Sequence, residues 1–295
     1  MKFTLRDKLT SQQQLEEYNM NNQTWLITGV SSGFGLELTK QLLEKGHTVI
    51  GTVRNDDTVQ TLIKQYPKTF DREFLDVTDT EAIQLLINKI YQKHKIIDVL
   101  VNNAGYGLFG AAEELTDQEI DKIVATNLTG SIQMIRAVIP FMRMQQAGRI
   151  IQISSYGGQV AFAGNSMYHA TKWGIEGFCE SVTQELAPFN IGVTIVEPGG
   201  ARTEFRYGSA HVAELMPEYD NNPAHAFLTM LDPTNGLAAG DPVKMATRMI
   251  ESATVEPAPL RIILGSQALD STIQTLEKRV EDFKKQTRLA ASTDF

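Results

Sequence analysis

The sequence of 295 residues has one cysteine, no excess of positive charge and no long apolar run. A single cysteine, Cys179, excludes an internal disulfide framework, and its apolar helical surroundings indicate a small buried side chain. A formal net charge of −8 without a basic cluster argues against a nucleic-acid partner. No apolar run approaches the roughly 18 residues that a membrane-spanning helix needs, and the N-terminus shows no apolar secretory segment. We therefore expect a cytoplasmic protein that does not enter a membrane.

The apolar residues alternate between short runs and longer patterns with helical spacing. Strands are predicted at 24–28, 48–53, 72–75, 98–102, 149–154, 192–197 and 260–264. Helices are predicted near 34–45, 57–66, 79–94, 117–144, 166–188, 241–252 and 267–290. This alternation predicts a parallel sheet, and strands that are apolar throughout predict helices on both faces of it. The expected fold is a single doubly wound α/β domain.

Two segments fall outside this alternation. Residues 1–20 are polar and rich in glutamine, so we expect residues 1–22 to be a weakly ordered extension, or the result of an alternative start, before a domain at 23–295. Residues 203–240 are too long for a connecting loop and too irregular for one helix. Their aromatic and methionine content favours a lid over a substrate site rather than disorder. The residues concerned are Phe205, Tyr207, Met216, Tyr219, Phe227 and Met230.

A glycine-rich stretch, TGVSSGFG (28–35), joins the first expected strand to the first helix. Its glycines allow a sharp turn and a close approach of the main chain to a pyrophosphate, which the free N–H groups of the helix N-terminus then bind. The spacing G-x-x-x-G-x-G differs from the general dinucleotide fingerprint, and no Lys-Ser/Thr follows as in a P-loop. The stretch predicts a nucleotide-binding turn, with a purely structural turn as the alternative.

Polar residues recur near the ends of later strands. NNAG (102–105) follows the fourth expected strand, and QISSYGG (152–158) closes the fifth. Asn127 lies inside an expected helix, where its amide competes for main-chain hydrogen bonds. Tyr168 and Lys172, in YHATK, share one helix face. Each feature has an ordinary structural explanation when taken singly.

In this order and spacing, the motifs resemble the short-chain dehydrogenase/reductase family, from about Thr24 to Thr203. Ser155 rather than Ser154 stands thirteen residues before Tyr168, as in the family's motif. The resemblance implies a Rossmann-type fold and a catalytic tetrad of Asn127, Ser155, Tyr168 and Lys172. It also implies a cofactor site, without a metal ion, formed by Gly29, Ser31, Ser32, Gly33, Phe34, Gly35, Arg54, Asp76, Val77, Asn103, Ala104, Gly105, Tyr168, Lys172, Pro198, Gly199 and Thr203.

The implied chemistry is hydride transfer between NADP(H) and a carbonyl or alcohol. A phenol has a pKa of about 10, and lowering it to about 7 takes about 4 kcal/mol. An ammonium group at ~4 Å in an effective dielectric of ~20 supplies about this energy. We therefore expect Lys172 to lower the pKa of Tyr168, which protonates the substrate oxygen as general acid, while Ser155 hydrogen-bonds the same oxygen. The resemblance adds that Lys172 binds the nicotinamide ribose and that Asn127 holds a water.

The end of the second strand bears on the choice of cofactor. An arginine there accommodates the 2′-phosphate of NADP, and an acidic residue favours NAD. The resemblance places Val53 where the acidic residue would stand, and Arg54 follows it, so NADP is expected. NAD stays as the alternative because Ser32 fills a position that often carries a second basic residue in the family, and Asp56 and Asp57 oppose Arg54.

The apolar lid, joined by Phe109 and Phe162, predicts a medium or bulky hydrophobic ketone, aldehyde or secondary alcohol as substrate. The same side chains have another explanation, which is packing against a neighbouring subunit, and the expected assembly is a homodimer or homotetramer. A catalytically silent protein that senses NADP(H) is the alternative function. A nucleotide-sugar epimerase would need a larger segment than the roughly ninety residues after Thr203.

Overall fold

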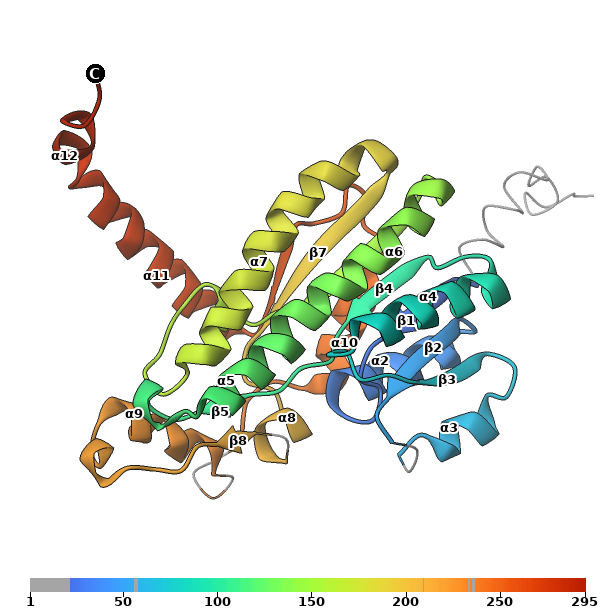
Figure 1. Ribbon diagram of the computed structural model, residues 1–295, viewed down its shortest axis with the longest axis horizontal. Coiled ribbons are helices and arrows are strands. Elements are labelled where there is room, and N and C mark those ends of the chain that lie inside the picture. The colour runs from blue at the N-terminus through green and yellow to red at the C-terminus, as the bar shows by residue number, and fades with distance from the viewer. Residues whose placement is uncertain (1–21, 56–57, 209, 233, 235–236) are drawn as a thin grey trace, which may run out of the picture.

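The computed structural model describes residues 22–55, 58–208, 210–232, 234 and 237–295 (Figure 1). The expected extension at 1–22 lies outside these ranges except for its last residue, and Asp56 and Asp57 lie outside them too. The side chains of Tyr207 and Met230 are likewise outside the described part.

Seven strands form one fully parallel sheet in the order β3-β2-β1-β4-β6-β7-β9. They are β1 (Thr24–Ile27), β2 (Thr48–Val53), β3 (Phe70–Phe74), β4 (Val99–Asn102), β6 (Gly148–Ile153), β7 (Ile191–Pro198) and β9 (Arg261–Leu264). The chain runs outward from β1 to β3 and then crosses back to β4. This reversal between β1 and β4 is the switch point at which open α/β sheets bind ligands.

Helices cover both faces of the sheet. The longer ones are α2 (Gly33–Glu44), α4 (Thr80–His94), α6 (Ser131–Gln145), α7 (Ser166–Leu186), α10 (Pro242–Ser252) and α11 (Ser266–Lys284). The shorter ones are α3 (Gln60–Gln65), α5 (Asp117–Ile123), α8 (Glu204–Tyr207), α9 (Pro223–Ala226) and α12 (Thr287–Ala291). The doubly wound Rossmann-type fold expected from the sequence is confirmed.

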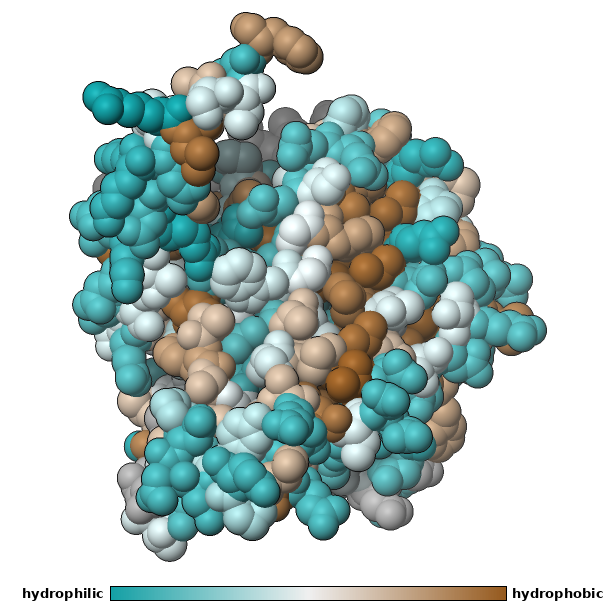
Figure 2. All heavy atoms as spheres, turned by 60° about the vertical axis from the view of Figure 1, so that its left-hand side comes forward, coloured by the Kyte–Doolittle hydropathy of each residue, from teal (hydrophilic) through white to brown (hydrophobic). Residues whose placement is uncertain are grey.

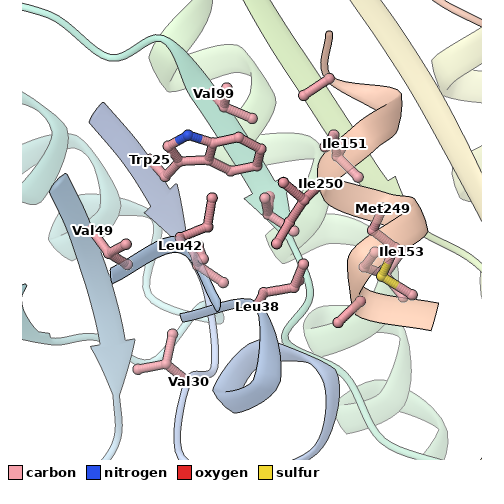
Figure 3. Packing of buried hydrophobic residues seen from close by; sticks show 14 of the residues in the cluster. Trp25, Val30, Leu38, Leu42, Val49, Val99, Ile151, Ile153, Met249 and Ile250 are labelled. Carbon is pink, nitrogen blue, oxygen red and sulfur yellow. The ribbon is translucent and has the colours of Figure 1, made fainter. Parts of the chain in front are cut away.

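Two apolar clusters hold these layers together. Neighbouring side chains of a strand point to opposite faces, so Trp25 and Ile27 of β1 enter one cluster while Leu26 enters the other. The first cluster lies under α2 and α10, as Leu38 and Ile250 show (Figure 3). The second lies under α4, α6 and α7. Both faces of the strands are buried, which explains why the strands are apolar throughout.

The expected elements are found with small shifts at their ends, and two expected helices are interrupted. The helix expected at 117–144 is α5, a wider π-helical turn at Val124–Gly130, and α6. The helix expected at 267–290 is α11 followed by α12. A short parallel pair was not expected, and it joins β5 (Leu108–Phe109) to β8 (His211–Val212). No helix in the described ranges is long and apolar enough to cross a membrane.

Candidate active site

A cavity of about 950 Å³ opens at the carboxyl ends of the central strands. Sixteen of the seventeen cofactor positions and three of the four tetrad positions predicted from the sequence line this cavity. Among the described residues, Gly35 and Asn127 are the predicted ones that do not line it. The rest do: Gly29, Ser31, Ser32, Gly33, Phe34, Arg54, Asp76, Val77, Asn103, Ala104, Gly105, Ser155, Tyr168, Lys172, Pro198, Gly199 and Thr203.

The glycine turn forms one wall of the cavity. Gly29 and Gly33 have φ angles of +73° and +55°, which side chains other than glycine rarely adopt. A Cβ at Gly35 would collide with the carbonyl oxygen of Gly29, so Gly35 serves the turn from behind. Within the described residues, the first turn of α2 has no acidic side chain, and the Ser32 side chain does not cap it. Its N–H groups therefore fit an anion such as a pyrophosphate.

The NNAG segment is fixed to the same turn by Thr28, which the sequence patterns did not single out. The Thr28 hydroxyl accepts hydrogen bonds from the main-chain N–H groups of Asn103 and Ala104, each at 3.0 Å. The Asn103 amide donates to the carbonyl oxygens of Thr28 and Gly29 at 2.9 Å. The two motifs therefore form one rigid floor.

Asn127 fixes the far end of this floor. Its Oδ1 accepts from the Tyr106 N–H at 3.1 Å, and its Nδ2 donates to the Tyr106 carbonyl at 2.8 Å. Asn127 lies in the π-helical turn that interrupts the expected helix. Its amide bonds to Tyr106 instead of competing for the main-chain hydrogen bonds of a regular helix, which accounts for an asparagine at this position. In the described structure the Asn127 amide supports the cavity from outside its lining.

The adenine-side positions lie at the ends of β2 and β3. Asp76 accepts hydrogen bonds from the Thr78 N–H at 2.9 Å and the Thr78 hydroxyl at 2.8 Å. The Thr78 N–H, and more weakly the positive charge of Arg54, hold the pKa of Asp76 below its usual value. Arg54 and Lys122 both line this end of the cavity, which therefore presents positive charge.

Ser155, Tyr168 and Lys172 come together where β6 ends and α7 begins. All three are buried. The Lys172 Nζ donates to the Ile153 carbonyl at 2.9 Å and lies 5.7 Å from the centre of the Tyr168 ring. The Ser155 Oγ accepts from the Gly157 N–H at 3.0 Å.

Burial governs the acidity of this group. Burial raises the pKa of Tyr168 to about 12, and the hydrogen bond with Ser155 only partly opposes it. Burial also lowers the pKa of Lys172 to about 8, although the Glu176 carboxylate works in the other direction. A low-polarity environment disfavours the charged form of both partners. The expected net lowering of the Tyr168 pKa is therefore wrong for this structure, in which burial sets the direction of the shift.

His169 is a further lining residue that the sequence patterns did not single out. Its Nε2 accepts from the Phe162 N–H at 3.0 Å, and its Nδ1 donates to the Gly157 carbonyl at 2.7 Å. Burial lowers the pKa of His169 and so disfavours its charged form, although the Gly157 hydrogen bond works in the other direction. His169 thus fixes the loop between Ser155 and Phe162.

A buried carboxylate one turn after Lys172 ties the same loop to α7. Glu176 accepts from the Ser154 hydroxyl at 2.5 Å and from the Gln159 amide. Arg261 of β9 contacts Glu176 and donates to Glu197 at 2.9 Å. Burial, and then the Glu176 charge, raise the pKa of Glu197 to about 7. The Ser154 hydroxyl is committed to this network, which supports the choice of Ser155 for the cavity.

The other end of the cavity is apolar. The Phe109 ring lies 5.6 Å from that of Phe227 and 6.4 Å from that of Tyr168, measured between centres. Phe205 lies 5.8 Å from Tyr168, and Phe162 and Leu231 also line this end. Three of these five side chains belong to the segment 203–240.

Residues of this segment dock on a buried carboxylate, Glu114. Its Oε1 accepts from the Met216 N–H at 2.7 Å and meets the His225 Nε2 at 2.6 Å. Its Oε2 accepts from the Ala111 N–H at 2.6 Å. The β5–β8 pair and a contact of 2.6 Å between His211 and Glu119 add to this docking. Neither Glu114 nor His225 belongs to a sequence motif.

The chain belongs to the short-chain dehydrogenase family, whose family model matches residues 23–211. An oxidoreductase of Botryotinia fuckeliana is 34% identical over 249 residues, which cover 83% of this chain and 90% of that protein. A 3-ketodihydrosphingosine reductase of Bacteroides thetaiotaomicron is 36% identical over 72% of this chain and 76% of its own. Retinol dehydrogenase 8 of Homo sapiens is 35% identical over 72% and 70%.

Solved structures show the same likeness. A short-chain dehydrogenase from Streptomyces avermitilis has a TM-score of 0.87 and 36% identity, and the match covers 93% of this chain and 99% of that one. ElxO with NADP bound has a TM-score of 0.70 and 26% identity, and the match covers 84% of this chain and 99% of that one. The family and the relatives establish an oxidoreductase that acts on CH–OH or C=O groups and a fold that binds NAD or NADP.

Proposed function

We propose that this protein transfers hydride between NADP(H) and a medium or bulky hydrophobic ketone, aldehyde or secondary alcohol. The observation that carries the proposal is the position of Ser155, Tyr168 and Lys172 between the glycine turn and an apolar pocket within one cavity. A cofactor on the glycine turn and a substrate in the apolar pocket would meet at these three side chains.

The cofactor site consists of the positions that line the cavity from the glycine turn to Thr203. The open N-terminus of α2 would hold the pyrophosphate, Asp76 and the NNAG floor would hold the adenosine half, and Arg54 would pair with the 2′-phosphate of NADP. The cofactor would supply the hydride. The NADP-bound relative ElxO supports the choice of NADP over NAD.

Tyr168 acts as the general acid in the reduction direction. Because its pKa is about 12, the phenol carries its proton at neutral pH and is ready to donate it. Lys172, charged below about pH 8, stabilises the phenolate that forms. The Ser155 hydroxyl donates a hydrogen bond to the substrate oxygen that Tyr168 protonates, and it stabilises the negative charge that develops there. Asn127 holds the floor on which the cofactor would lie.

The substrate class follows from the apolar end. Phenylalanine and leucine side chains select ligands by apolar contact, with Ser155 and Tyr168 as the polar anchors. The names of two relatives, 3-ketodihydrosphingosine reductase and retinol dehydrogenase 8, refer to a lipid ketone and a lipid alcohol, which supports a hydrophobic substrate. The segment 203–240 would act as the lid over this end of the catalytic domain at 23–295. We place the enzyme in the cytoplasm as a homodimer or homotetramer.

The proposal is tested by measuring the fall in NADPH absorbance as the enzyme oxidises the cofactor in the presence of each of a panel of ketones. We expect turnover with bulky aliphatic, aromatic or polycyclic ketones, and far less with sugars or small hydroxy acids. A profile led by small charged substrates would contradict the substrate class. Tight NADPH binding without turnover on any carbonyl would instead favour the alternative, a catalytically silent protein that senses NADP(H).

A further inference from the structure

The last long helix leaves the body of the protein (Figures 1 and 2). Near its start α11 is anchored by the buried residues Ala268 and Thr272. Further along, the Arg279 guanidinium lies 4.8 Å from the Trp173 ring centre and donates to the Gln159 carbonyl at 3.1 Å. Every residue from 280 to 295 is exposed. An isolated helix of this length is marginally stable in water. Contacts with another helix would therefore stabilise the outer half of α11.

An apolar stripe runs along the exposed side of α11. It comprises Leu269, Ile273, Leu276, Val280 and Phe283, whose exposed fractions lie between 38% and 63%. The residues are alternately four and three positions apart, which is the heptad spacing of a coiled-coil seam. Because successive residues are turned by about 100°, the stripe lies roughly a quarter turn away from the anchored face. It is therefore free to receive a second helix.

We propose that the stripe of α11 pairs with the stripe of α11 in a second copy of this chain, with the two helices antiparallel. A two-fold axis near Lys278 brings Ile273 opposite Phe283 of the second copy, and Leu276 opposite Val280. In heptad notation Ile273 and Val280 are a positions, and Leu269, Leu276 and Phe283 are d positions. Each of these pairs therefore joins an a position to a d position, as knobs-into-holes packing requires. The stripe is complementary to itself, so the partner it fits is another α11.

Charges beside the stripe select this orientation. Asp270, Glu277 and Lys284 flank it on one side, each directly after a d position. The antiparallel register places Asp270 beside Lys284 of the second copy, and this attractive pair occurs twice by symmetry. A parallel pair would instead place Lys284 beside Arg279 of the second copy, two like charges. Glu277 faces its own counterpart at the axis, so the pair is held at both ends and weakest in the middle.

The α11 pair would be an interface of the homo-oligomer that belongs to the proposed function. An experiment on this pair therefore has to report on α11 alone. Figure 2 shows another band of apolar side chains that runs diagonally across the body. A dimer formed through that band would be indistinguishable by size. Cross-linking from chosen positions on α11 separates the two cases, and the native thiol, Cys179, is buried and does not compete.

Glu277→Cys places a thiol at the predicted two-fold axis, and Glu281→Cys places one a turn further along and about 40° further round the helix, away from the stripe and the axis. With a short bifunctional thiol reagent and the full chain, we expect Glu277→Cys to form covalent dimers many times faster than Glu281→Cys. Adding Ile273→Asp to Glu277→Cys should abolish the difference, because it buries a charge in the seam. Equal rates for the two thiols would overturn the proposal.

A charge exchange tests the orientation. In the Glu277→Cys background, Asp270→Lys should lower the cross-linking rate several-fold, because it opposes Lys284 of the second copy. Adding Lys284→Asp should restore the rate, while Asp294→Lys, which changes net charge equally at the far end of the chain, should leave it nearly unchanged. A double variant that cross-links no faster than Asp270→Lys would overturn the antiparallel register. NADPH turnover reports separately on the proposed function.

Discussion

The two ends of the cavity are built in different ways. The cofactor end rests on short local motifs: a glycine turn of eight residues, four residues of NNAG and the helix start behind them. The apolar end depends on contacts between distant segments, such as Glu114 and His225, which are 111 positions apart. Short motifs within the sheet suit a ligand that stays the same, such as the cofactor. The segment 203–240 lies outside the sheet and can change in sequence without disturbing the fold. The comparison therefore predicts that changes at one end leave the other largely intact.

The largest effect is expected where the two ends meet. Tyr168→Phe removes the proton donor but keeps the ring that packs beside Phe109 and Phe205. Turnover should fall by about 10²- to 10⁴-fold, the usual contribution of a general acid, while the NADPH dissociation constant stays nearly unchanged. Steady-state kinetics and fluorescence titration measure the two quantities. Residual turnover above a few per cent would remove Tyr168 from the role of general acid.

A smaller effect, confined to the cofactor end, is expected at Arg54. A charge-assisted hydrogen bond contributes about 1.5–3 kcal/mol, so Arg54→Ala should lower kcat/KM for NADPH by roughly ten- to 150-fold and leave NADH nearly unaffected. Combination with Val53→Asp should move the preference to NAD. Lys122→Ala is the control for positive charge at the same end of the cavity. An equal loss in that variant, or a wild type that prefers NAD, would contradict the assignment.

At the apolar end, Phe227→Ala should separate substrates by size. Loss of a partly buried phenylalanine costs about 1.5 kcal/mol or more, so the KM for a bulky ketone should rise about tenfold. The KM values for a small ketone and for NADPH should stay within about twofold, because the ring faces Phe109 rather than the glycine turn. Leu289→Ala, on the exposed α12, is the matched control. A parallel rise in the KM for NADPH would break the separation between the two ends.

The smallest effect concerns docking of the lid and its dependence on pH. Burial works to raise the pKa of Glu114, but hydrogen bonds from Met216, His225 and Ala111 outweigh it and hold the pKa below the usual 4.5. A depressed carboxyl pKa contributes stability that is present above the usual pKa and is lost as pH falls through the lowered value. Proteolysis within 203–240 should therefore accelerate in acid.

Glu114→Gln should give several-fold faster proteolysis already at neutral pH, because the amide cannot accept the same set of bonds. Glu113→Gln is the matched control, since among the described residues the Glu113 carboxylate meets the lid through the Tyr219 hydroxyl alone. Identical cleavage rates in the two variants would show that Glu114 does not dock the lid.

The same difference between local and distant contacts explains how far the sequence could be interpreted. Local sequence patterns were enough to predict the strands, the helices, the glycine turn and the Tyr168–Lys172 pair. In the structure, the glycine turn and this pair line the same cavity at the carboxyl ends of the strands. The Glu176–Arg261–Glu197 network and the β5–β8 pair depend on segments whose meeting no local pattern records. The acidity of Tyr168 also required the structure, because its burial decides the direction of the pKa shift.

The β5–β8 pair has a thermodynamic consequence. Residues 103–109 form the cofactor floor at one end and β5 at the other, and β5 carries His211 and Val212 of the lid through the register Leu108↔His211 and Phe109↔Val212. A ligand that steadies the floor therefore also restrains the strand on which the lid rests. By linkage, if the first ligand tightens the second by some factor, the second tightens the first by the same factor. Two residues of parallel strand thus connect the proposed cofactor and substrate sites, and cooperative binding of the two ligands is the expected result.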